Sequence, residues 1–206
     1  MSTDLSASGT PRATAGSRAR RSWRGLVLEN AAVVVVFALA GVGAGWFWER
    51  WATPASGVVL DGAWRLGFRV EGDFLTGDAT SFQRAFGVVG TYVVVCAVVG
   101  LVLGVLTAVL CRRSELVTLA AVLVGSALAA FLCYRVGLAL GPPDPAVAAR
   151  TADDGAVLVG DLSIDRRSPF VAMPLVALVA LASTWFLTTS ASVGAAEARR
   201  VDLPQA

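Results

Sequence analysis

Two long apolar segments, joined by a short charged turn, constrain this chain more than any other feature of its sequence. Residues 85–111 carry no charged side chain, and residues 116–140 carry only Arg135, near their end. About 20 apolar residues in a helix are enough to cross the ~30 Å hydrocarbon layer of a bilayer. The sequence therefore predicts two membrane-spanning helices, with the turn between them at one membrane surface.

Two further segments have the same character. Residues 31–48 are apolar and end among Trp46, Trp48 and Trp51, a pattern typical of a helix anchored at the membrane interface. This run is longer than the ~7–15 apolar residues of a signal peptide, which favours an uncleaved helix. Residues 169–191 again carry no charge. We predict four spans, at about residues 27–48, 85–111, 116–140 and 169–191.

The composition agrees with a membrane protein, because 56% of the residues are hydrophobic and the mean hydropathy is +0.69. We expect an all-α integral membrane protein, a four-transmembrane-helix bundle with a small extracytoplasmic β-rich cap. The outer loops at about 49–84 and 141–168 would form the cap, and residues 25–191 the transmembrane domain. Residues 1–24 are polar and basic, which predicts a disordered cytoplasmic N-terminus, and residues 192–206 a loose cytoplasmic tail.

Alternation in the first outer loop predicts a β-hairpin at about residues 57–71. Asp61-Gly62 is a dipeptide favoured in two-residue hairpin turns. From residue 64 to 71, apolar and polar side chains alternate with the period of a strand. We expect an apolar face that packs on the bundle (Trp64, Leu66, Phe68 and Val70) and an outward face that contacts a partner (Arg65, Arg69 and Glu71). Residues 71–80 are expected to be loop, and residues 156–159 and 162–164 short strands.

Arginine positions predict the orientation. The two sides of the membrane would carry nearly equal numbers of arginines, so their distance from the spans decides. A cluster precedes the first span, and Arg112 and Arg113 occupy the short central turn, whereas the arginines of the outer loops are dispersed. We expect a multi-pass protein of the plasma (inner) membrane with both termini in the cytoplasm.

Small residues recur at helical spacing in every span. Helices in lipid associate through small residues, which allow their backbones to approach closely. We assign six positions to helix packing: Gly41, Gly45, Gly100, Gly104, Gly125 and Ala129. The alternative, in which such a stripe lines a pore or guides oligomerisation, stays open.

The sequence offers little for catalysis. Histidine is absent, which removes the usual general base near neutral pH and a common metal ligand. No nucleophile motif or phosphate-binding glycine loop is present, and Cys96, Cys111 and Cys133 lie in or beside apolar segments, where they are expected to pack. Acidic residues of the outer loops are better explained as solvated charges than as a calcium site. We expect no enzymatic activity, no cofactor and no metal.

The order of these parts resembles an uncharacterised family of four-span membrane proteins from mycobacteria and related actinobacteria, which carry a domain of unknown function. The resemblance covers about residues 31–191. It is carried by Trp-Ala-Thr-Pro at residues 51–54, Gly-Val-Val-Leu-Asp-Gly at 57–62 and Arg-Ser-Pro-Phe at 167–170. It implies an inner-membrane location and no known activity, ligand or catalytic residue.

Two functions remain in view. The first is a non-enzymatic cell-envelope accessory or assembly component that acts through its cap, with the lipid bilayer and another envelope membrane protein as partners. The net charge of +2 gives no reason to expect nucleic acid, and a homo-oligomer is left open. The alternative is a small transporter or channel for an apolar or zwitterionic solute, whose path would use the polar residues of the spans (Thr91, Thr107, Ser126 and Thr184).

Overall fold

The computed structural model describes residues 15–72, 74–111, 114–164 and 168–201, with side-chain environments described between residues 25 and 190. Its long helices are α1 (Ala15–Trp51), α2 (Ala79–Leu110), α3 (Glu115–Leu140) and α5 (Ala172–Val201). The short helices are α4 (Pro145–Ala148) and the 3-10 helix η1 (Ser168–Val171). The strands are β1 (Ser56–Leu60), β2 (Ala63–Leu66), β3 (Phe68–Glu71), β4 (Phe74–Gly77) and β5 (Val157–Val159).

Four helical segments are long and apolar enough to cross a membrane, as the sequence predicts. They cover Gly25–Trp51, Ala79–Leu110, Glu115–Ala148 and Ser168–Ser190. The fold is therefore mostly helical with small antiparallel sheets, which is compatible with a multi-pass membrane protein.

The helices extend beyond the predicted spans. Helix α1 begins at Ala15, within the segment expected to be disordered, and α5 continues to Val201 into the predicted loose tail; residues 1–14 and 202–206 lie outside the described part. Adding residues to an existing helix requires no new nucleation, and alanine and arginine are good helix formers. Helix α2 begins before residue 85 because the side chain of Asp78 accepts a hydrogen bond from the backbone N–H of Thr80 and caps the helix there.

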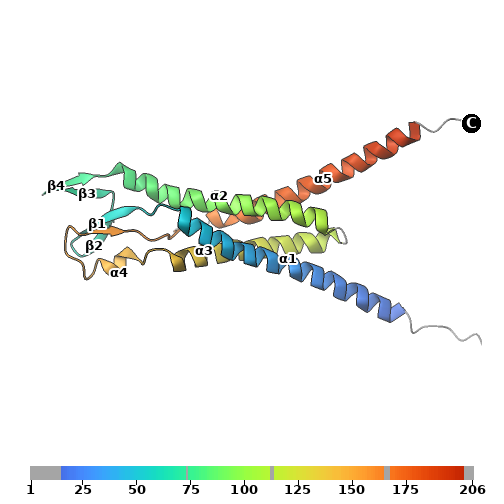
Figure 1. Ribbon diagram of the computed structural model, residues 1–206, viewed down its shortest axis with the longest axis horizontal. Helices are drawn as coiled ribbons and strands as arrows, with labels where there is room; N and C mark the ends of the chain where they lie inside the picture. The colour runs from blue at the N-terminus through green and yellow to red at the C-terminus, as the bar shows by residue number, and fades with distance from the viewer. Residues whose placement is uncertain (1–14, 73, 112–113, 165–167, 202–206) are drawn as a thin grey trace, which may run out of the picture.

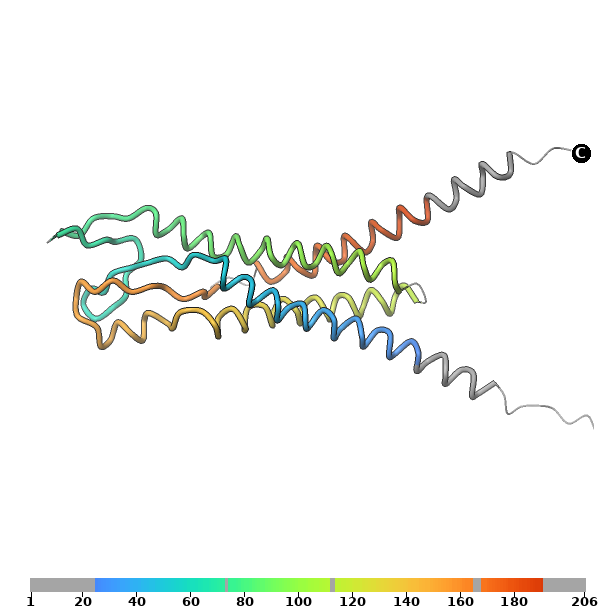
Figure 2. The backbone as a smooth tube through the Cα atoms, viewed as in Figure 1, coloured from blue at the N-terminus to red at the C-terminus, as the bar shows by residue number. Residues whose placement is uncertain are grey.

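The molecule is elongated, with the strands gathered at one end and the start of α1 and the end of α5, which lead to the chain termini, at the other (Figure 1). The tube view in Figure 2 shows α1 and α5 diverging toward the end that carries the termini. The two outer loops thus form a cap at the end of the bundle opposite the chain ends.

The four long helices form two close pairs, α1 with α3 and α2 with α5. Because successive spans alternate in direction, each pair consists of parallel helices. Helix α1 contacts α3 through Gly41, where a Cβ atom would overlap the backbone of Ala129, and through Gly45, where it would overlap the backbone of Cys133. Gly125 of α3 lies against Phe37 of α1. Close approach of this kind increases van der Waals contact along the pair.

The α2–α5 pair repeats this arrangement. A Cβ atom on Gly100 would lie 2.8 Å from the carbonyl oxygen of Met173, and one on Gly104 would overlap the carbonyl oxygen of Ala177. Met173 and Ala177 are themselves fully buried. The six residues assigned to packing therefore lie at the seams of the two pairs.

Aromatic side chains join the two pairs near the cap. The indole N–H of Trp48 on α1 donates to the carbonyl oxygen of Val88 on α2, at 3.0 Å. The hydroxyl of Tyr92 on α2 donates to the carbonyl oxygen of Ala130 on α3, at 2.8 Å. The Trp48 and Tyr92 rings meet edge to face, and both side chains are completely buried. The indole N–H of Trp48 and the hydroxyl of Tyr92 thus both have a partner, which a buried indole or phenol requires.

The cap contains a three-stranded antiparallel sheet in the order β2–β1–β5. Asp61 and Gly62 both have positive φ, as a two-residue type I′ turn requires, and they join β1 to β2 as predicted. Trp64 crosses β1 over Gly57 and donates from its indole N–H to the carbonyl oxygen of Leu158 on β5, at 3.3 Å. The two outer loops are therefore one structural unit.

The predicted strand at residues 64–71 is interrupted, which corrects the expected 57–71 hairpin. Gly67 has φ +90°, so the chain turns between β2 and β3. Strand β3 then pairs with β4 in a second, two-stranded sheet. Strand β4 lies within residues 71–80, for which the sequence predicted a loop. Phe68 is consequently 42% exposed rather than packed on the bundle.

The second outer loop matches its prediction in part. Strand β5 lies within the predicted strand at 156–159, but residues 162–164 form no strand. Leu162 and Ile164 are buried nevertheless, because they pack into the core of the bundle. The short helix α4 was not predicted; Asp144 caps it by accepting from the backbone N–H of Ala146.

Candidate functional site

The two-stranded sheet β3–β4, called the ribbon from here on, is the part of the cap with the least covering. Its register pairs Phe68 with Gly77, Val70 with Leu75, and Glu71 with Phe74. Since opposed residues of a sheet share a face, Phe68, Val70 and Leu75 form one apolar face. Leu75 is 51% exposed and Val70 half-buried, so this face is largely uncovered in the structure.

The opposite face of the ribbon is mostly polar. It carries Arg69, Glu71 and Thr76 together with Phe74, which is 76% exposed. In Figure 1 the ribbon lies at the far end of the cap, beyond the start of α2. Large apolar side chains exposed this far from the helical bundle are typical of an interaction surface.

The structure places the three predicted contact residues in two groups. Arg69 and Glu71 share the polar face of the ribbon, whereas Arg65 is exposed on β2 of the other sheet. The guanidinium of Arg69 donates to the carboxylate of Asp78 across 3.4 Å, with 59% of the Arg69 side chain still exposed. The sequence did not indicate Phe74 and Leu75 as part of this surface, because it predicted loop at these residues.

Asp78 joins the ribbon to the helical bundle. Its carboxylate accepts from the backbone N–H and the hydroxyl of Thr80, and its own backbone N–H donates to the carbonyl oxygen of Gly67. The Thr80 hydroxyl is the main cause that holds the pKa of Asp78 below its ordinary value; Arg69 and Arg84 lower it further by their charge. Asp78 is therefore ionised at neutral pH and fixes the ribbon to the first turn of α2.

The described acidic residues of the cap are not gathered in one cluster. Within those residues no group of three potential ligands comes together, and Asp73 and Asp165 lie outside them. Several of the carboxylates have structural partners instead: the Asp154 carboxylate accepts from the backbone N–H of Gly62, and the Asp161 carboxylate from the hydroxyl of Ser163.

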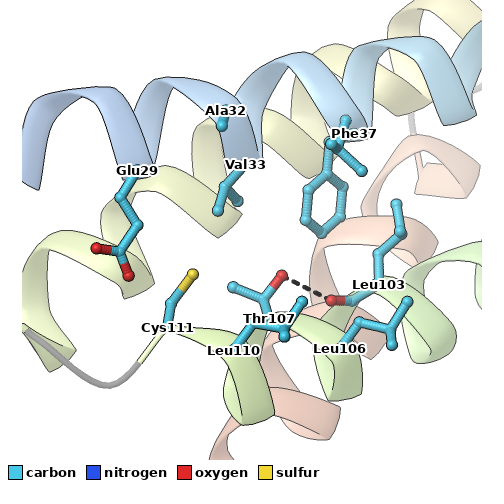
Figure 3. Close-up of a pocket in the computed structure, with 10 residues that line it drawn as sticks. Glu29, Ala32, Val33, Phe37, Leu103, Leu106, Thr107, Leu110 and Cys111 are labelled. Atoms are coloured by element: carbon cyan, nitrogen blue, oxygen red, sulfur yellow. Dashed lines mark hydrogen bonds between the residues drawn. The ribbon is translucent and has the colours of Figure 1, made fainter. Parts of the chain in front are cut away.

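A pocket of about 500 Å³ lies between α1 and α2 at the end of the bundle that carries the termini. Figure 3 shows the Glu29 carboxylate and the Cys111 thiol pointing toward one another at its edge. The rest of its lining is apolar apart from Thr107, whose hydroxyl donates to the carbonyl oxygen of Leu103 at 2.7 Å. The pocket is therefore an apolar hollow whose polar side chains are Glu29, Thr107 and Cys111.

The polar residues of the proposed solute path do not converge. The hydroxyls of Thr91, Thr107, Ser126 and Thr184 each donate to a carbonyl oxygen of their own helix, three or four residues earlier. Thr91 lines hollows near the cap and Thr107 the pocket near the termini, while Ser126 is completely buried. Hydroxyls satisfied within their own helix give no reason to prefer the transport hypothesis.

Comparison with known proteins assigns no class and no particular protein to this fold. No family model, no curated protein and no solved structure matches the chain.

Proposed function

We propose that this chain is a non-enzymatic multi-pass protein of the plasma (inner) membrane, with both termini in the cytoplasm, that binds another envelope protein through the ribbon of its cap. It would act as an accessory or assembly component. The observation that carries the proposal is the uncovered apolar face of the ribbon, formed by Phe68, Val70 and Leu75.

The ribbon needs more support than its own two strands provide. A two-stranded sheet is marginally stable alone in water, and this one is joined to the start of α2 by two contacts of Asp78, with the Gly67 carbonyl oxygen and with the Arg69 guanidinium. Burying the apolar face against a partner would remove Phe68 and Leu75 from water, which is favourable by about 25 cal/mol per Å² of apolar surface. Arg69, Glu71 and Arg65 would then flank the contact and favour a partner of complementary charge.

A protein partner suits this position better than lipid does. The ribbon lies at the end of the cap farthest from the chain termini (Figure 1), beyond the first turn of α2. Helix α2 has 32 residues and begins at Ala79, so at ~1.5 Å per residue it is longer than the ~30 Å hydrocarbon layer, and its first turns would hold the ribbon in the aqueous phase. The proposed orientation rests on the arginines beside the first span and in the central turn.

The test is purification of the tagged full-length chain from its native membrane in mild detergent, with quantitative mass spectrometry of co-purifying proteins. Leu75→Asp would place a charge on the apolar face of the ribbon and is expected to reduce recovery of a stoichiometric partner at least tenfold. Val147→Asp is the matched control, because Val147 is 63% exposed on α4, outside the ribbon. Both variants should reach wild-type abundance in the membrane.

Arg65→Glu with Arg69→Glu tests the flanking charges and should also reduce recovery of the same partner. Equal recovery of all co-purifying proteins by the wild type, Leu75→Asp and Val147→Asp would contradict binding through the ribbon. Loss of the partner in Val147→Asp alone would move the contact to α4 and equally reject the proposal.

A further inference from the structure

The seam between α1 and α2 is hollow on the cap side of the bundle. Three adjoining hollows, of about 300, 400 and 500 Å³, follow one another along it. Trp51 lines all three; Gly87 and Thr91 line the two nearest the cap, and Val94 the two farthest from it. The shared lining residues make these hollows one continuous groove, called the seam groove below.

The character of the seam groove changes along its length. Its cap end carries the polar side chains of Thr53, Thr80, Gln83 and Arg84 beside the Trp51 ring. Its deeper end is apolar throughout and is lined by Gly43, Phe47, Trp51, Val94 and Val98 among others. A groove that is cationic at one end and apolar along the rest has the polarity of a single phospholipid.

Three glycines open this groove without serving helix contact. A Cβ atom on Gly43, Gly87 or Gly90 would meet nothing within 4 Å. By contrast, a Cβ atom on Gly41, two residues from Gly43 on the same helix, would overlap the backbone of Ala129. The space beside the glycines within each helix pair is thus occupied by the paired helix. The space beside Gly43, Gly87 and Gly90, in the seam groove between α1 and α2, is empty in the structure.

The groove lies at the depth that a lipid of the cap-side leaflet would occupy. Twenty helical residues, rising ~1.5 Å each, cover the ~30 Å hydrocarbon layer and extend from Leu110 to about Thr91. Arg84 is then ~10 Å above the hydrocarbon boundary, among the head groups, and Val98 is ~10 Å below it. Trp51, at the boundary, matches the preference of tryptophan for the interface.

Arg84 is available to a ligand. Among the described residues, its guanidinium takes part in no ion pair and no side-chain hydrogen bond. Asp78 acts on it through space, but Thr80 and Arg69 already bind the Asp78 carboxylate. A guanidinium matches a phosphate in charge and geometry and can bind it with two hydrogen bonds.

We propose that the seam groove binds one phospholipid of the cap-side leaflet, with an acyl chain along Val94 and Val98 and the phosphate at Arg84. This assignment requires the membrane insertion proposed above but not the partner of the ribbon. The phosphate is the group that Arg84 recognises, and the open glycines admit the chain.

The test is native mass spectrometry of the delipidated full-length chain, released from detergent and titrated with dioleoylphosphatidylglycerol. One lipid should bind to the wild type at the lowest concentrations. Arg84→Gln should weaken this binding about tenfold, as expected for loss of a charge-assisted hydrogen bond, and Gly90→Leu, which fills the groove, should abolish it. Arg150→Gln and Ala127→Leu are the controls, because both residues are exposed outside the groove. Thermal melting in detergent should show that all four variants are folded.

Dioleoylglycerol, which lacks the phosphate, should bind the wild type no better than it binds Arg84→Gln. Equal affinity of the wild type for the two lipids would overturn the role of Arg84. Unchanged lipid binding in Gly90→Leu, or a dimer whose formation Gly90→Leu prevents and lipid does not affect, would overturn the groove as a lipid site. Because no partner protein is present, none of these outcomes depends on the ribbon.

Discussion

Glycines in similar sequence contexts have different surroundings in this molecule. Gly41 and Gly43 lie two residues apart on α1, yet one touches the backbone of α3 and the other faces the empty seam groove. The four-residue spacing of small residues indicated that helices pack closely. It did not indicate which glycines would stay uncovered, because that depends on which helices pair.

Alanine at these two positions should have opposite effects on stability. Gly41→Ala places a methyl group against Ala129 and should lower the free energy of unfolding by about 1–3 kcal/mol, as overpacking does. Gly43→Ala meets no atom and should leave stability unchanged or raise it by up to about 1 kcal/mol. Denaturant unfolding in detergent measures both; equal destabilisation would mean that α1 and α3 do not approach at Gly41.

The capping carboxylate of Asp78 should make the cap sensitive to acid. Because its pKa is lower in the folded chain than in the unfolded chain, its contribution is present above the unfolded pKa of about 4 and is lost as the pH falls toward the lower folded value. Asp78→Ala should melt below the wild type at pH 7, and the gap should close below about pH 4. Glu71→Ala, an exposed carboxylate on the ribbon, is the control and should melt close to the wild type at pH 7.

At the scale of the element, the Trp64 side chain connects the strands of the three-stranded sheet. Trp64 fills the space over Gly57, reaches Leu158 and lies against Gly160, so it holds β5 to the rest of the sheet. Alternation of residue types predicted Trp64 and Leu66 on the inner face, and both are half-buried. The break at Gly67 was missed because alternation continues through it, and only the positive φ reveals the turn.

Removal of this tryptophan should loosen the second outer loop. Trp64→Ala should increase the rate of tryptic cleavage after Arg150, an exposed residue of that loop, at least severalfold. Phe74→Ala removes a ring that is 76% exposed on the ribbon and should leave this rate unchanged. The time course of cleavage, followed by mass spectrometry, compares the two variants. Equal cleavage rates in Trp64→Ala and the wild type would show that Trp64 does not hold β5 to the sheet.

At the scale of the whole molecule, the cap and the chain termini lie at opposite ends of the helical bundle (Figure 1). Hydropathy predicted the four spans and therefore the cap at one end and the termini at the other. It could not predict the pairing of α1 with α3 and α2 with α5, because apolar side chains pack equally well against lipid and against protein. The seam groove follows from that pairing, since α1 and α2 each pack closely against a different helix.

The proposed orientation predicts which positions a membrane-impermeant thiol reagent reaches in intact cells. Asp153→Cys, in the cap, should be labelled, whereas Glu115→Cys, at the start of α3, should be labelled only after the membrane is opened. The native Cys96, Cys111 and Cys133 are buried, so the wild type supplies the background. The opposite labelling pattern would place the cap in the cytoplasm.

The interleaved pairing also sets an order of events during synthesis. Helix α1 ends at residue 51, but its partner α3 is complete only at residue 140, and α2 must likewise wait for α5. At about 5–20 residues per second, the ribosome takes roughly 4–18 s to add the intervening chain. In the proposed membrane topology, the glycine faces of α1 and α2 have no partner helix during this time. In that topology, the translocon or lipid would cover these faces until each helix receives its partner.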